Sequence, residues 1–216
     1  MIINKLNLIK NEIQLKINES KFRPKIIAVS KTYEMNNILP LIKHGHEDFG
    51  ENKVQEALLK WKHIKLDYPN IKLHMIGKIQ TNKVKYVVDL FDYVHSLDNI
   101  NLAEKISIEQ KNKKKSLKIF IQVNIGNEIQ KSGISLDKLN EFCILCTRDL
   151  KLNIIGLMCL PPKDDNTKEY FIKMKNLAQK INIKELSMGM SNDYLDAAKH
   201  GATYLRIGSK IFGNRN

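Results

Sequence analysis

The sequence has few of the residues that mark disulfide-rich, flexible or membrane-spanning proteins. Its 216 residues include only three cysteines, at positions 143, 146 and 159, which excludes a disulfide scaffold and fits a reducing compartment. Ten glycines and five prolines form no rich segment, so no flexible linker divides the chain. No uninterrupted apolar run is long enough to cross a membrane. We therefore expect one globular domain, residues 1–216, in the cytoplasm.

Arginine is also scarce, although the chain is strongly basic. The formal net charge is +13, yet only four of the 36 basic residues are arginines. Nucleic-acid sites favour arginine for bidentate contacts and aromatic residues for stacking, and neither gathers beside the lysines here. The densest basic run, KNKKKSLK at 111–118, is interpreted as a solvated connector before a strand. We expect no nucleic-acid partner.

The pair CILC at 143–146 has the CxxC spacing of some zinc and redox sites. A zinc site needs a second pair of ligands, and the six histidines supply no doublet at a suitable spacing. Free cysteine usually packs as a small apolar residue. We expect buried thiols on a helix, and no metal.

Short apolar runs recur along the chain, with helix-compatible segments between them. Continuous apolar strands that alternate with helices indicate a parallel sheet, and eight units predict an α/β fold, a single (β/α)8 TIM barrel. A doubly wound open sheet is the alternative. The segment MIINKLNLIKNEIQLKINES predicts an extra amphipathic N-terminal helix rather than a signal peptide or membrane span. The runs KIIAVS, HEDFG, IKLHMIG, YVHS, KIFIQVNI, IIGLMCL, ELSM and TYLRIG start at 25, 46, 71, 93, 118, 154, 185 and 203.

A lysine, Lys31, follows the first predicted strand. Functional residues of such barrels lie on the loops after the strand C-termini, so Lys31 belongs to that rim. Polar residues at the ends of other strands, such as Asn52, His95 and Ser191, are expected there too. A rim lysine can simply reach water. Alternatively, it can form a Schiff base with an aldehyde, which requires a neutral amine or a tightly held aldehyde.

The last two predicted strands end in serine and glycine. SMGMS at 187–191 and RIGS at 206–209 each precede a predicted helix. Barrels often bind phosphate at this position, and glycine lets backbone N–H groups approach an anion, although a glycine turn or a helix cap would look the same. Arg206 either pairs with a carboxylate or donates a hydrogen bond to the ring nitrogen of pyridoxal phosphate.

Several blocks, in order along nearly the whole chain, resemble the pyridoxal phosphate homeostasis proteins, which share the barrel of the alanine racemase N-terminal domain. The resemblance implies that Lys31 carries pyridoxal 5'-phosphate as an internal aldimine and that Asn52 lies beside it. It also implies that Ser191 and the Gly208 region hold the phosphate and that Arg206 faces the pyridine nitrogen. The blocks are IIAVSK at 26, FGENKVQEA at 49, HMIGKIQTNKVK at 74, VHSLDN at 94, QVNIGNEIQKSG at 122, GLM at 156, LSMGMSNDY at 186 and RIGSKIFGNR at 206.

The expected role is that of a carrier rather than an enzyme. Racemisation needs acid–base groups on both faces of the cofactor, and in the related racemases a tyrosine from an additional C-terminal domain supplies the second one. Only GSKIFGNRN follows the last predicted strand, so we expect that second base to be missing. The resemblance implies a protein that buffers pyridoxal phosphate and influences amino-acid metabolism. A weak racemase or another pyridoxal phosphate enzyme is the alternative, and a lysine-dependent aldolase is a further one.

The expected partners follow from the same resemblance. They are pyridoxal phosphate itself and, as recipients, apo forms of enzymes that use it. We expect a monomer with no membrane partner. Lys131, in QKSG after the fifth predicted strand, is a second rim lysine that is either solvated or a transient stop for departing cofactor.

Overall fold

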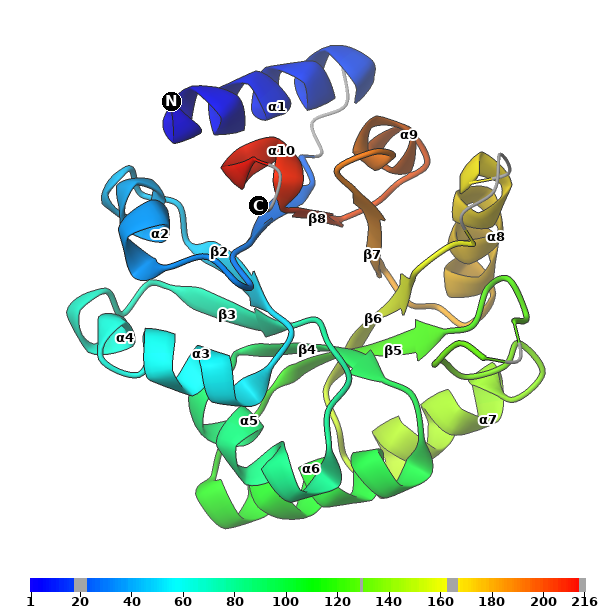
Figure 1. Ribbon diagram of the computed structural model, residues 1–216. Coiled ribbons are helices and arrows are strands. Elements are labelled where there is room, and N and C mark those ends of the chain that lie inside the picture. Colours follow the sequence, from blue (N-terminus) through cyan, green and yellow to red (C-terminus); the bar gives the residue numbers. More distant parts are fainter. Residues whose placement is uncertain (18–22, 129, 163–166, 214–216) are drawn as a thin grey trace.

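Eight parallel strands close into a barrel in chain order, from β1 to β8, with helices around it (Figure 1). This computed structural model describes residues 1–17, 23–128, 130–162 and 167–213. β8 pairs with β1, and Arg206 lies opposite Ile27. The predicted TIM barrel is confirmed, and each predicted apolar run overlaps one strand. The strands are β1 (Lys25–Val29), β2 (Asp48–Glu51), β3 (Lys72–Met75), β4 (Tyr93–Leu97), β5 (Lys118–Val123), β6 (Ile154–Cys159), β7 (Glu185–Met190) and β8 (Tyr204–Ile207).

The segments between the strands form helices because their apolar residues recur at helical spacing. In the helix after β1, Ile38, Leu41 and Ile42 are buried against the outside of the barrel. The helices are α1 (Ile2–Ile17), α2 (Met35–Lys43), α3 (Val54–Trp61), α4 (Ile64–Asp67), the 3-10 turn η1 (Thr81–Lys83), α5 (Val84–Leu90), α6 (Ile100–Lys113), α7 (Leu139–Ile144), the π-helical η2 (Leu145–Asp149), α8 (Thr167–Lys180), α9 (Tyr194–Lys199) and α10 (Ser209–Phe212).

The predicted N-terminal helix is present as α1, outside the alternating pattern. Leu6, Ile9 and Ile13 lie on one face of α1 and are buried. This helix packs against α9 and α10 (Figure 1), and Tyr194 of α9 donates a hydrogen bond to Glu12. Among the helices that the structure describes, none has the length and apolar character required to cross a bilayer.

The barrel wall separates two apolar cores. The larger core lies between strands and helices and contains Phe49 and Trp61. The smaller core fills the interior, where two imidazoles lie among aromatic rings: His74 stacks on Tyr93 with 4.2 Å between centroids, and His95 stacks on Phe120 at 4.3 Å. The apolar members of this interior core are Ile27, Tyr93, Phe120, Met158 and Tyr204.

The three cysteines are free thiols. Cys146, in η2, and Cys159, in β6, are buried, and Cys143 of α7 is half-buried. Burial raises the pKa of Cys146 and of Cys159 to about 12, so both stay protonated at neutral pH. Within the described part of the chain, no three histidine, cysteine, aspartate or glutamate side chains are placed to hold a metal ion.

Candidate functional site

Four of the predicted site residues follow strands that are neighbours in the barrel. Ser191 follows β7, Gly208 follows β8, Lys31 follows β1 and Asn52 follows β2. A Cβ added to Gly208 would lie 3.4 Å from Val29, the last residue of β1. Closure of the barrel therefore brings the two ends of the sequence together at one rim.

The turn that carries Lys31 is held in an unusual backbone conformation. Lys31 is half-buried, and Thr32 has a φ of 68°, a left-handed conformation that costs free energy in a residue other than glycine. The N–H of Thr32 donates to Glu56 Oε1 at 2.5 Å, and the N–H of Tyr33 donates to the Ser30 carbonyl at 3.1 Å. Contacts with α3 thus set the direction in which Lys31 leaves the strand.

A buried carboxylate, Glu51, stabilises this turn through hydrogen bonds. Its Oε1 accepts hydrogen bonds from Ser30 Oγ at 2.7 Å, Trp61 Nε1 at 2.9 Å and Lys60 Nζ at 3.0 Å. Lys60 Nζ also donates to the Ser30 carbonyl at 2.9 Å. The side chains of Glu51 and Lys60 are 0% and 9% exposed. Sequence analysis missed Lys60 and Trp61, because one lysine among many gives no signal and a tryptophan usually indicates core packing.

Asn52 follows β2 and is half-buried. Its Oδ1 is buried and has no hydrogen-bond partner among the residues that the structure describes. A buried acceptor without a partner costs about 1–3 kcal/mol. The backbone here is tightly packed, since a Cβ on Gly77 would lie 2.3 Å from the Asn52 carbonyl oxygen. The position and unmet hydrogen bonding of this amide suit contact with a polar ligand.

Ser191 and Gly208 lie side by side. Ser191 Oγ accepts hydrogen bonds from the N–H of Gly208 at 3.3 Å and the N–H of Lys210 at 3.4 Å. Gly189 and Gly208 differ in whether the structure requires a glycine at that position. Gly189 has a φ of +90°, and an added Cβ would lie 2.5 Å from Ala197, so local packing demands glycine. Gly208 has a φ of −114° and room for a Cβ, so neither its backbone conformation nor the local packing requires glycine.

Arg206 lies within β8 with its guanidinium buried in the barrel. Nη1 donates to Ser187 Oγ at 2.7 Å, and Nη2 donates to the Cys159 carbonyl at 2.8 Å. No carboxylate of the described residues lies within ion-pair distance. Burial lowers the pKa of Arg206, but a guanidinium keeps its proton in proteins. Arg206 therefore provides a buried positive charge, and its guanidinium has further N–H groups besides the two that donate these hydrogen bonds.

One rim prediction is wrong: His95 lies inside the barrel. It occupies the middle of β4, and its side chain is fully buried. A histidine that closes an apolar run resembles a strand end in the sequence. In the structure the strand continues through it, because Ser187 and His74 provide hydrogen-bond partners for the imidazole.

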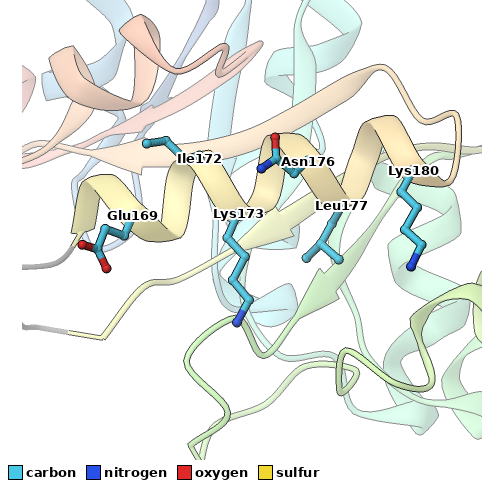
Figure 2. Close-up of a pocket in the computed structure, with 6 residues that line it drawn as sticks. All are labelled: Glu169, Ile172, Lys173, Asn176, Leu177 and Lys180. Atoms are coloured by element: carbon cyan, nitrogen blue, oxygen red, sulfur yellow. The ribbon is translucent and has the colours of Figure 1, made fainter.

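Two other features lie apart from these residues. Lys131 is exposed, and its amine pairs with the carboxylate of Glu128, so its role as a transient stop stays a prediction. A hollow of about 350 Å³ on the outer face of α8 contains none of the predicted site residues. Figure 2 shows that a single helix supplies the side chains along it, which are Glu169, Ile172, Lys173, Asn176, Leu177 and Lys180.

Comparison with known proteins gives a match over nearly the whole chain. The family model of the alanine racemase N-terminal domain matches residues 5–216. The pyridoxal phosphate homeostasis protein of Vibrio alginolyticus is 37% identical over 204 residues, which cover 88% of this chain and 86% of that protein.

Solved structures agree with these sequence matches. PipY of Synechococcus elongatus, solved with pyridoxal phosphate bound, superposes with a TM-score of 0.85 at 29% identity, over 99% of this chain and 100% of PipY. Alanine racemase of Clostridium difficile superposes with a TM-score of 0.74 at 15% identity, over 98% of this chain and 57% of that enzyme. The second match shows a shared fold.

Proposed function

Because the chain belongs to the alanine racemase N-terminal domain family and, within it, to the pyridoxal phosphate homeostasis proteins, we propose that it holds pyridoxal 5'-phosphate and releases it to other proteins. One observation carries the proposal. The four rim residues Lys31, Asn52, Ser191 and Gly208 follow neighbouring strands of one barrel, and Arg206 lies in β8, two residues before Gly208. The chain also spans most of the length of its homeostasis relatives.

The residues present fit this ligand. Pyridoxal phosphate supplies an aldehyde, a ring nitrogen and a phosphate. Lys31 follows β1 at the rim, and its amine would condense with the aldehyde, whose oxygen would leave as water. The side chain of Asn52, whose buried Oδ1 has no hydrogen-bond partner among the described residues, would contact the polar edge of the ring. Ser191 Oγ and the N–H groups of Gly208 and Lys210 would hold the phosphate.

Arg206 supports a role without turnover. Its guanidinium can donate a hydrogen bond to the ring nitrogen but does not readily give up a proton. An unprotonated ring withdraws electrons poorly, which disfavours carbanion chemistry. We propose that the protein is a non-catalytic carrier and regulator, and that apo forms of pyridoxal phosphate enzymes are its recipients.

Transfer of the cofactor to an apo-enzyme tests this function. Loaded protein, freed of unbound cofactor, should restore the activity of an apo-aminotransferase, while a panel of amino acids incubated with the loaded protein should show no racemisation or other turnover. Protein that retains the cofactor in the presence of apo-enzyme would argue against a carrier. Turnover of any amino acid would favour the alternative, a weak pyridoxal phosphate enzyme.

Ser191→Ala should weaken binding of pyridoxal phosphate about tenfold, because it removes a hydroxyl at the proposed phosphate position. Binding of pyridoxal, which has no phosphate, should change little. Equilibrium titration followed by absorbance measures both affinities. Equal losses for the two ligands would place the phosphate elsewhere.

The setting of this function is proposed on the same grounds. The three free thiols fit a reducing compartment, and we propose a cytoplasmic location. We also propose that residues 1–216 act as a single domain and as a monomer. Lys131→Ala in the transfer assay measures whether the second rim lysine takes part, since an unchanged transfer rate would remove it from the path.

A further inference from the structure

A chain of hydrogen bonds runs through the barrel interior and ends at Arg206. Starting from Arg206, it passes through Ser187 to His95 Nδ1 at 2.8 Å. His95 Nε2 then meets His74 Nδ1 at 2.9 Å, and His74 Nε2 meets Asp48 Oδ1 at 2.9 Å. The five side chains come from β8, β7, β4, β3 and β2, so the chain crosses the barrel from one side to the other.

The two ends of this hydrogen-bond chain, Arg206 and Asp48, differ in the hydrogen bonds that they can make. A guanidinium has only donors, and an ionised carboxylate has only acceptors. Asp48 lies at the amino end of β2, is 18% exposed and lines a hollow of about 640 Å³ between α1 and the barrel. Burial raises the pKa of Asp48, but its hydrogen bond with His74 and the positive charge of Lys25 lower it overall. Asp48 is therefore ionised at neutral pH.

Because Arg206 can only donate and Asp48 can only accept, neutral imidazoles of His95 and His74 between them can hold their protons in a single arrangement. His74 must carry its proton on Nε2 to donate to Asp48, which leaves Nδ1 bare. His95 must then donate from Nε2, and its bare Nδ1 accepts the hydroxyl proton of Ser187. Ser187 Oγ in turn accepts from Arg206. Every donor in the chain points from Arg206 toward Asp48.

The environment favours neutral rings. Burial lowers the pKa of His95 well below its usual value, and the positive charge of Arg206 lowers it further. Burial also lowers the pKa of His74, against the opposing effect of Asp48. Hydrogen bonds aligned in one direction polarise one another in a medium of low dielectric constant. The chain thus links the buried positive charge of Arg206 to a carboxylate with which it makes no direct contact.

We propose that His95 and His74 are positioning residues, which act through Ser187 to hold the Arg206 guanidinium in one orientation so that its remaining N–H groups face the cofactor. The contact of Arg206 with the cofactor rests on the proposed function. The direction in which the hydrogen bonds are donated, from Arg206 to Asp48, does not. Ser187 alone could rotate its hydroxyl freely, and His95 removes that freedom by supplying a bare nitrogen as the acceptor.

The first experiment needs no ligand. Nitrogen-15 NMR of histidine-labelled protein distinguishes bare ring nitrogens from protonated ones. Both His74 and His95 should be neutral, with the proton on Nε2. A proton on Nδ1 of either ring, or a doubly protonated ring, would overturn the proposal whether or not pyridoxal phosphate binds.

A pair of variants then tests the effect on the site. In His95→Gln, the side-chain carbonyl can still accept from Ser187 and the amide can still donate to His74, so cofactor affinity should stay within about twofold of wild type. His95→Phe keeps a planar ring against Phe120 but removes both hydrogen bonds, so affinity should fall about tenfold. Met158→Leu, elsewhere in the interior core, is the packing control and should bind normally.

The outcomes separate this proposal from the proposed function. Equal affinities for the Gln and Phe variants would show that His95 only fills space. Wild-type protein that binds no pyridoxal phosphate would contradict the proposed function, while the NMR result would still decide the direction of the chain.

Discussion

Lys31→Ala should abolish covalent attachment of pyridoxal phosphate. In wild type, Lys31 is half-buried and follows β1 at the rim, within the turn formed by Ser30 and Thr32. Alanine removes the nucleophile and leaves the turn intact, so the near-ultraviolet and visible band of the lysine-bound cofactor should disappear. After borohydride, mass spectrometry of wild type should find the cofactor on the peptide that contains residue 31, and find no such peptide in the variant.

Lys131→Ala is the matched control, because Lys131 is the other rim lysine predicted from the sequence. This variant should keep the full band and the adduct on residue 31. A band that persists in Lys31→Ala, with the adduct on another lysine, would contradict the assignment of Lys31. Absence of a band in wild type with excess cofactor would mean that the barrel retains the family fold without this ligand, and an aldolase-like use of Lys31 would become the better hypothesis.

Glu51→Ala should lower the free energy of unfolding by about 3–5 kcal/mol, the usual cost of removing one partner of a buried ion pair. Without Glu51, the nearly buried amine of Lys60 loses its buried carboxylate, and Ser30 Oγ and Trp61 Nε1 lose their acceptor. Urea unfolding followed by circular dichroism measures the change. A loss below about 1 kcal/mol would show that water replaces the carboxylate.

Two further variants separate charge from hydrogen bonding at this position. Glu51→Gln keeps an acceptor oxygen of similar shape and should cost less than Glu51→Ala. Glu51→Gln leaves the Lys60 amine with only the partly exposed carboxylate of Glu56 as its ion-pair partner. Adding Lys60→Met removes this amine and should recover part of the loss, because replacing both charges of a buried pair is tolerated better than replacing one. If the double variant lost the sum of the losses measured for Glu51→Gln alone and for Lys60→Met alone, the pair would not be coupled.

The fold and the rim could be predicted because their sequence patterns are local. Each strand is a short apolar run, so a parallel barrel followed from the alternation of runs and helices. Lys31, Asn52, Ser191 and Gly208 come directly after strands, and the ends of parallel strands meet at one rim. Their mutual placement needed only the assumption that the barrel closes.

The chain of hydrogen bonds through the barrel interior could not be predicted in the same way. His74, His95 and Ser187 are polar residues within strands, and a polar residue beside an apolar run is equally consistent with the end of that run. Their hydrogen bonds join β3, β4 and β7, and no spacing along the sequence reports which strands face each other across a barrel. The contact of Lys60 with the Lys31 turn was missed for a related reason, since it joins α3 to the end of β1 and not to β2, the strand that directly precedes α3.

Closure of the barrel between β1 and β8 also has a consequence for biosynthesis. A ribosome makes Lys31 well before Arg206 and Gly208, yet the proposed site requires all three residues, and β1 pairs with β8. Contacts between distant parts of a chain form slowly, because closing a long loop costs entropy. A nascent chain therefore cannot assemble the site until β8 has docked beside β1. Binding of the ligand thus indicates that the barrel has closed.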